Sequence, residues 1–295
     1  MRGIIYAFLA MISYSSTPTF TQVGYRAGIR TNTLLFSRHL VSLICLLPSV
    51  LKKETFEGIT RKQIPGLLIL SAFAVIGNIT FNYAYHYLPN MVAISVSLSY
   101  IVFVFVIEMI IGRETYSPKR LLIVSLTFLG LIIIAVPGAG GQFPIKAFIV
   151  GIIASLMYST QVILISSENL RPVHTNVILL TGVIPIMIYS SIRCLALGEP
   201  LLPSGTVQWI SIICMGTIGV IVARGLFYRS MKIIGATTAS MIDSLEPLSS
   251  AVLGFVLRNQ GLSLYIVLGS ILMMFSTIML LKEKKPSEQN SSEDR

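Results

Sequence analysis

Long apolar runs recur along the whole chain and restrict what it can fold into. Each run is about 20 residues long, the length that an α-helix needs to cross roughly 30 Å of hydrocarbon. We predict ten of them, at residues 3–22, 33–51, 64–86, 91–112, 120–137, 147–167, 175–195, 208–229, 236–257 and 262–281. Backbone groups must be hydrogen-bonded in lipid, and runs this long favour helices over a closed barrel. The sequence therefore predicts an all-α membrane protein with ten transmembrane helices.

The composition and the placement of charge agree with a membrane protein. Hydrophobic residues make up 54% of the chain and charged residues 12%, far from the balance of a soluble domain. If the connections alternate between two sides, the side that holds Arg2 receives 15 lysines and arginines and the other side 5. The positive-inside rule then places both termini in the cytoplasm of a protein of the inner (plasma) membrane. No basic stripe interleaved with aromatic residues occurs, so no nucleic-acid partner is expected despite the net charge of +10.

The sequence predicts neither a metal site nor a cofactor. The cysteines, Cys45, Cys194 and Cys214, are too widely spaced for a zinc pattern or a disulfide framework. No P-loop pattern is present, so direct use of ATP is not expected. The first residues lack a small-x-small cleavage site and continue into a full span, which predicts a retained first helix rather than a signal peptide.

An internal repeat divides the chain near its middle. A shift of 144 residues aligns "AMISYSS" (10–16) with "ASLMYST" (154–160), and "RTNTLLFSR" (30–38) with "HTNVILLTG" (174–182). At nearly the same shift, Tyr100 to Val102 of the fourth span fall opposite Glu246 and Pro247 of the ninth. An odd number of spans per repeat would insert the second copy upside down, as in transporters with inverted repeats. The predicted units are a first five-helix repeat (1–138), a glycine-rich linker (139–146), a second repeat (147–282) and a disordered cytoplasmic tail (283–295).

Three local features accompany the five-plus-five layout: Arg38 in "FSRHL", a proline inside "GATTASMIDSLEPLSSAVLGFVL", and the helix end "MIIGRE". With these, residues 3–282 resemble the EamA-type ten-helix transporters of the drug/metabolite transporter superfamily. The fourth span departs from that pattern, because Tyr100 or Val102 stands where the family usually has proline. The ninth span ends in Asn259 and Gln260 instead of glycine and glutamate. The resemblance implies a transporter, in a superfamily that exports or imports amino acids, nucleotide sugars, quaternary amines and drugs.

Two carboxylates lie at the centre of the ninth span. Asp243 and Glu246 are three residues apart, on one face of a helix, in a stripe that also contains Ser240. An ionised group at this depth costs at least about 2.5 kcal/mol if it faces lipid, so both acids should face protein or a water-filled cavity. Pro247 cannot donate to the carbonyl of Asp243, which leaves an acceptor free beside them. We interpret the pair as a site for a cation, an amino group or a coupling proton; the alternative is a structural pair neutralised by Arg38 or Arg224.

Other polar residues in the spans are candidates for the same substrate site. They are Asn78 and Asn82 in the third span, Tyr14 in the first, Tyr100 in the fourth, Tyr158 and Gln161 in the sixth, and the two arginines Arg38 and Arg224. Tyrosine rings would attract an ammonium group through cation–π contacts, although each could instead be ordinary packing. The arginines could bind a substrate carboxylate or phosphate, or could snorkel to the membrane surface. Glu108 is expected at the membrane interface, and His39 and His86 near the outer surface.

The predicted function is a secondary transporter that moves a small polar metabolite, such as an amino acid or an amine, by alternating access. Burial favours the neutral form of a carboxylate, so Glu246 and Asp243 are candidate proton carriers. The expected partners are a small-molecule solute and membrane lipid, with the chain as a monomer or homodimer. Two alternatives remain: a non-transporting scaffold or lipid-handling subunit, and an intramembrane enzyme. The enzyme is disfavoured because aspartyl-type chemistry brings its two acids from separate helices, and these two lie on one.

Overall fold

The computed structural model describes residues 1–88, 90–113, 117–135, 144–258 and 263–282. This part of the chain is helical and contains no strands. The first half contains α1 (Arg2–Arg26), α2 (Thr31–Val50), η1 (Lys53–Thr55), α3 (Ile64–Tyr87), α4 (Asn90–Leu98), α5 (Tyr100–Ile110) and α6 (Pro118–Ala135). The second half contains α7 (Ile145–Ile165), α8 (Thr175–Leu197), α9 (Thr206–Cys214), η3 (Met215–Arg224), α10 (Gly225–Ile234), α11 (Ala236–Asp243), α12 (Glu246–Arg258) and α13 (Leu264–Lys282). The predicted tail and most of the predicted linker lie outside the described residues.

Eight helical segments of the described chain are long and apolar enough to span a membrane. They are α2, α3, the α4–α5 segment, α6, α7, α8, the continuous rod α9–η3–α10, and α13. The remaining two predicted spans correspond to α1 and to α11–α12, which carry the polar middle sections. Their membrane crossing, and with it the count of ten, stays a prediction.

The fourth segment of each half is broken at equivalent positions. In the first half α4 ends at Leu98 and α5 begins at Tyr100; in the second half α11 ends at Asp243 and α12 begins at Glu246. Pro247 explains the second break, because its ring and missing N–H disrupt the turn that would bond the carbonyl of Asp243. The first break has no proline. There the Ser99 hydroxyl donates to the carbonyl of Val96 at 2.6 Å, a local bond that competes with the helical ladder.

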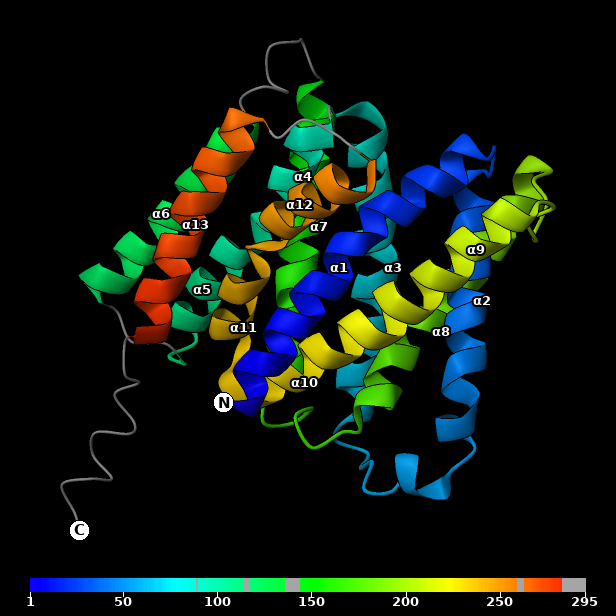
Figure 1. Ribbon diagram of the computed structural model, residues 1–295. Coiled ribbons are helices and arrows are strands. Elements are labelled where there is room, and N and C mark those ends of the chain that lie inside the picture. Colours follow the sequence, from blue (N-terminus) through cyan, green and yellow to red (C-terminus); the bar gives the residue numbers. More distant parts are fainter. Residues whose placement is uncertain (89, 114–116, 136–143, 259–262, 283–295) are drawn as a thin grey trace.

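The packing of the two halves is reciprocal. α3 runs along α7, and its counterpart, the rod α9–η3–α10, runs along α1 (Figure 1). Likewise α4 and α5 pack on α7, as α11 and α12 pack on α1. The equivalent helices α2 and α8 contact one another, as do α6 and α13. Each helix therefore finds its main neighbour in the other half, so the hydrophobic core is shared between the halves.

Glycines permit the closest of these approaches. A Cβ on Gly130 of α6 would lie 2.7 Å from the carbonyl oxygen of Gly269 in α13, and a Cβ on Gly269 would lie 2.6 Å from the carbonyl oxygen of Gly130. Similarly, a Cβ on Gly216 of η3 would lie 2.7 Å from the carbonyl oxygen of Arg38 in α2. Small residues at such crossings let backbones meet where the hydrophobic effect gives little drive for association in lipid.

The eighth predicted span differs most from its expected form. We expected a helix over 208–229, but the rod continues to Ile234, and its middle section η3 is a π-helix. Such widened turns are uncommon and often mark functional sites. Arg224, expected near the end of this span, instead lies ten residues before the end of the rod.

Candidate functional site

Asp243 and Tyr100 meet where the two halves join. The Tyr100 hydroxyl donates a hydrogen bond of 2.6 Å to Oδ2 of Asp243, and both side chains are buried. Oδ1 of Asp243 is buried without a hydrogen-bond partner in the described chain. Both residues lie at the breaks, where the fourth segments of the two halves change from one helix to the next. A carboxylate with a free lone pair therefore sits at the centre of the pseudo-symmetric assembly.

Glu246 lies beside Asp243 in the first turn of α12. The two carboxylates interact electrostatically, although the break between α11 and α12 separates them. Glu246 is half-buried and has no hydrogen bond or ion pair among the described residues. A negative charge in the first turn of a helix is stabilised by the N-terminal backbone N–H groups. The pair thus forms an acidic centre without an internal counter-ion.

Tyrosines surround this centre. The rings of Tyr100 and Tyr158 pack edge to face with centroids 4.7 Å apart, and Tyr14 packs in the same manner on Phe227 at 6.1 Å. The hydroxyl of Tyr14 is buried and has no hydrogen-bond partner of normal geometry, though Tyr14 interacts electrostatically with Tyr158, Arg224 and Asp243. Tyr14, Tyr100 and Tyr158 are therefore gathered around Asp243.

Gln161 of α7 and the two asparagines of α3 belong to helices that pack against each other. A Cβ on Gly77 would lie 3.6 Å from Nε2 of Gln161, which places the Gln161 amide against α3. Asn82 donates through Nδ2 to Oδ1 of Asn78 at 2.9 Å, so the asparagines bond to each other within their own helix. The described contacts do not join these three amides to the acid pair.

Arg38 and Arg224 are half-buried in the bundle and interact with each other electrostatically. Neither guanidinium has a carboxylate within 4.0 Å in the described chain, where the one ion pair joins Arg30 to Glu199. The structural alternative, in which an arginine neutralises Asp243 or Glu246, is therefore wrong for this conformation. Nε of Arg38 is buried without a partner, which does not fit a side chain that snorkels.

Glu108 and His39, which were expected at or near the membrane surfaces, are both buried within the protein. Oε2 of Glu108 accepts from the Thr237 backbone N–H at 3.3 Å and from the Thr237 hydroxyl at 2.6 Å. It thereby satisfies the open N-terminus of α11. His39 is fully buried, with Nδ1 2.7 Å from the carbonyl oxygen of Leu35. His86 is exposed, with its ring edge to face on Tyr87.

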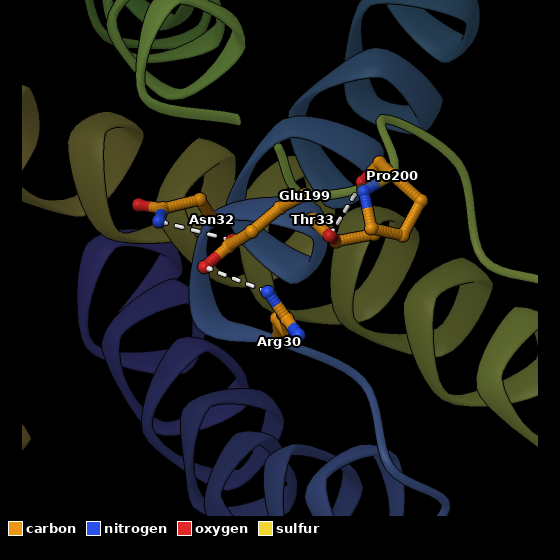
Figure 2. A network of polar contacts seen from close by, with 5 residues as sticks. All are labelled: Arg30, Asn32, Thr33, Glu199 and Pro200. Carbon is orange, nitrogen blue, oxygen red and sulfur yellow. Dashed lines mark hydrogen bonds and ion pairs between the residues drawn. The ribbon is translucent and has the colours of Figure 1, made fainter. Parts of the chain in front are cut away.

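A polar contact closes each end of the antiparallel pair α2 and α8. At one end, Nδ2 of Asn32 donates to Oε2 of Glu199 at 3.1 Å, and the Thr33 hydroxyl donates to the carbonyl of Pro200 at 2.6 Å (Figure 2). At the other end, Nδ2 of Asn176 donates to the hydroxyl oxygen of Ser49 at 2.6 Å. We call these the first latch (Asn32, Thr33, Glu199, Pro200) and the second latch (Asn176, Ser49). Asn32 and Asn176 are repeat equivalents.

A glutamine reinforces each latch in the same way. Gln63, at the start of α3, accepts from the Thr60 N–H at 2.9 Å and donates to the carbonyl of Asn169 at 3.1 Å. Gln208, near the start of α9, accepts from the Ser204 N–H at 3.1 Å and donates to the carbonyl of Ala27 at 2.7 Å. Sequence analysis missed both glutamines, although their separation of 145 positions, close to the repeat shift, was a usable signal.

One small pocket lies beside the first latch, away from the acid pair. Its volume is about 90 Å³, and its wall combines the α1–α2 turn with the α8–α9 connection. Arg30 and Thr33 line it on one side, and Pro200 and Gln208 on the other. It is a surface feature of the latch and does not coincide with the site predicted from the sequence.

Comparison with known proteins identifies a family that accounts for nearly all of the chain. The sequence profile of the EamA-like transporter family matches residues 1–136 and again residues 145–282. A solved structure titled "Crystal structure of protein" has a TM-score of 0.77 and 14% sequence identity, and covers 94% of this chain and 96% of that one. This likeness supports the fold alone. No curated protein matches the chain. With two family repeats that account for nearly all of its length, the chain belongs to the EamA-like transporter family, within the drug/metabolite transporter superfamily.

Proposed function

We propose that this chain is a secondary transporter that moves a small polar metabolite across the cell membrane by alternating access. The solute would bind between the two repeats, at Asp243 and Glu246. The observation that carries the proposal is the contact of Tyr100 with Asp243, because it joins the broken segments of the two repeats at a buried acid. A carboxylate inside the membrane is costly, and such residues usually mark a substrate or ion path.

The acidic centre favours a solute with a positive nitrogen. Asp243 has one free carboxylate oxygen, and Glu246 has no described partner, so together they offer several acceptors to an ammonium group. The faces of Tyr14, Tyr100 and Tyr158 would add cation–π attraction of about 1–2 kcal/mol once water is excluded. An amino acid or an amine has the required chemistry.

Alternating access would use the two latches. Both are closed in this conformation, by equivalent asparagines at opposite ends of the α2–α8 pair. Opening one latch while the other stays closed would expose the acidic centre to one side of the membrane at a time. The reciprocal packing of the halves supports this motion, because inverted repeats can exchange conformations around a fixed central site.

Proton coupling would use the same acids. Glu246 and Asp243 are the proposed carriers, because a carboxylate that loses its solvent or its cationic solute gains a proton more readily. An ammonium solute and a proton would then compete for one centre. That competition links the movement of the solute to the movement of the proton.

The proposed orientation has both termini in the cytoplasm. The start of α1 and the end of α13 lie toward the same end of the bundle, which supports an even number of membrane crossings (Figure 1). The larger number of lysines and arginines on the side of Arg2 then points to the cytoplasm. The functional unit would be a monomer or a homodimer and would need no cofactor.

Uptake by reconstituted proteoliposomes tests the proposal. Radiolabelled amino acids and amines are offered with and without an imposed pH gradient, to the parent protein and to Glu246→Gln and Asp243→Asn. We expect uptake of at least one solute by the parent, a loss of at least about tenfold in Asp243→Asn, and loss of the pH-gradient response in Glu246→Gln. Glu54→Gln, at an exposed acid outside the spans, is the matched control and should behave like the parent.

Three results would count against the proposal. A Glu246→Gln protein that keeps the parent's response to the pH gradient would remove Glu246 as the proton carrier. No uptake of any solute by a folded parent protein would favour a scaffold or lipid-handling role. Turnover of a lipid or peptide by the purified protein, abolished in Asp243→Asn, would favour an intramembrane enzyme.

A further inference from the structure

Arg38 reaches the interior of the bundle from α2, at a crossing built for close contact. A Cβ on Gly216 would lie only 2.7 Å from the carbonyl oxygen of Arg38. The backbones of α2 and η3 are therefore in contact at this point. The hydroxyl of Ser42 strengthens the crossing with a bond of 3.0 Å to the carbonyl of Gly216. Nε of Arg38 is buried there and has no hydrogen-bond partner. A donor fixed in this manner lacks an acceptor within the described chain.

Arg224 comes to the same region from the opposite half. It is the last residue of the π-helical section η3, and α8 makes room for it at Gly182. A Cβ on Gly182 would lie 3.7 Å from Nη1 of Arg224. Gly182 is the repeat equivalent of Arg38, so the second half has a glycine where the first half has its arginine. The two guanidinium groups thus come from non-equivalent positions, and they are near enough to interact electrostatically.

The positive charges of Arg38 and Arg224 are not balanced by a neighbouring acid in the described residues. Arg38 and Arg224 repel each other, and neither has a carboxylate within 4.0 Å in the described residues. His39 interacts with both arginines, Tyr25 with Arg38, and the phenols of Tyr14, Tyr158 and Tyr228 with Arg224. These neutral hydroxyls can donate or accept hydrogen bonds but bring no negative charge. The two arginine side chains therefore have no anionic partner among the described residues.

Asp243 and Glu246, the acids of the proposed substrate site, do not supply the missing anionic partner of the two arginines. Tyr14 interacts electrostatically with both Arg224 and Asp243. Asp243 accepts from Tyr100 and makes no ion pair. The described residues therefore include a basic pole, Arg38 and Arg224, and an acidic pole, Asp243 and Glu246, with no ion pair between them.

We propose that Arg38 and Arg224 form an anion-binding subsite, and that the transported solute is a dipolar ion. Its carboxylate, or an equivalent oxyanion, would lie between the two guanidinium groups with the Tyr14 hydroxyl as a further donor. Its ammonium group would face Asp243 and Glu246. Guanidinium groups suit this role, because they present paired N–H donors to two oxygens of one oxyanion. The inference rests on the proposed function and narrows its solute class from any small polar metabolite to molecules with both charges.

Matched sets of solutes test the inference on the purified full-length protein. The first set contains the common neutral amino acids and taurine, the second the amides of the same amino acids, and the third their N-acetyl forms. Thermal unfolding gives the concentration of each compound that produces half of its maximal rise in Tm. We expect at least one dipolar solute to act at a concentration at least about tenfold lower than its amide and its N-acetyl form, since each analogue leaves one pole unpaired.

Variants then assign the subsite. In Arg38→Gln and in Arg224→Gln, the advantage of the dipolar solute over its amide should fall below about twofold, while the response to the amide stays as in the parent. Arg38→Lys should recover only part of the advantage, because lysine lacks the planar fork. Arg193→Gln, at an exposed arginine of α8, is the matched control and should keep the full advantage.

The outcomes separate this inference from the proposed function. Equal responses of the parent protein to dipolar solutes and to their amides would overturn the anion subsite, even if the arginine variants did not fold. So would an unchanged advantage in folded Arg38→Gln and Arg224→Gln proteins. Transport of solutes that lack an oxyanion, with dipolar solutes inert, would overturn the inference and leave the transporter proposal standing. No response to any set, together with no uptake by proteoliposomes, would contradict both.

Discussion

The Tyr100 hydroxyl bonds to the carboxylate of Asp243 at 2.6 Å, and each residue lies at the break in the fourth segment of its own repeat. This contact is the shortest described link between the two breaks. It connects a change in the packing of one half to the protonation or occupancy of an acid in the other. A solute that binds Asp243 would be sensed by α4 and α5 through the same hydrogen bond.

Removal of this hydrogen bond should weaken transport more than folding. Tyr100→Phe keeps the ring contact with Tyr158 but leaves Oδ2 of Asp243 without its donor. Hydrogen bonds to charged groups contribute about 1.5–3 kcal/mol. We therefore expect the solute concentration for half-maximal uptake to rise by about tenfold or more. Tyr83→Phe, at an exposed tyrosine of α3, should leave uptake unchanged. An equally small effect of both substitutions would show that Tyr100 is not part of the substrate site.

Weakening the first latch and weakening the second latch should open opposite ends of the protein. Asn32→Ala removes the bond to Glu199 in the first latch, and Asn176→Ala removes the bond to Ser49 in the second. Each change should shift the population toward the conformation that is open at the weakened end. Hydrogen exchange followed by mass spectrometry should then show faster exchange in the α1–α2 turn for Asn32→Ala and in the α7–α8 connection for Asn176→Ala. Faster exchange at the same end in both variants would contradict the reciprocal arrangement.

Glu108 should stabilise the protein through the start of α11. Glu108→Ala leaves the Thr237 N–H and hydroxyl without their acceptor inside the bundle, where an unsatisfied polar group costs about 1–3 kcal/mol. We expect a clear fall in Tm of the purified protein, and a smaller fall in Glu108→Gln, which keeps an acceptor oxygen. If Glu108→Ala unfolded at the parent's temperature, the described capping of α11 would not matter for stability.

The glycine crossing of α6 and α13 should not tolerate a larger side chain. Gly130→Val would force a Cβ to within 2.7 Å of the Gly269 carbonyl oxygen, so the helices must separate. Overpacking of this kind costs about 1–3 kcal/mol, and a lower Tm is expected. Gly205→Ala is the control, because its nearest atoms would be 3.8 Å away in the side chain of Gln208. Equal Tm values for the two variants would argue against the close crossing.

The sequence predicted the repeat because its signal is long and redundant. Matches 144 residues apart in the first two spans, together with an odd number of spans per half, were sufficient to propose two equivalent units. The family profile, which matches each half separately, confirms the repeat. The sequence also showed a proline in the ninth span, which has a defined effect on a helix. We nevertheless expected one continuous helix over 236–257, whereas the structure breaks it between Asp243 and Glu246.

Other features depend on packing and have no local signal. The break at Ser99 has no proline, and neither has the π-helical section Met215–Arg224. Its glycines, Gly216 and Gly219, are ordinary in membrane helices. The burial of Glu108 follows from the open N-terminus of α11, which comes close only in the folded protein. For the same reason the absence of an ion pair between the acids and Arg38 or Arg224 could not be read from their positions in the spans.

Equilibrium binding of the solute that the proteoliposomes accumulate is the most direct measure of the central acidic site. The Kd is determined for the parent protein and for the double variant Asp243→Asn with Glu246→Gln, each shown to be folded by its thermal unfolding curve. We predict saturable binding to the parent and a Kd at least about 100-fold higher in the double variant, because a cationic group would lose both of its acidic partners. The same Kd in both proteins would place the solute elsewhere and contradict the account.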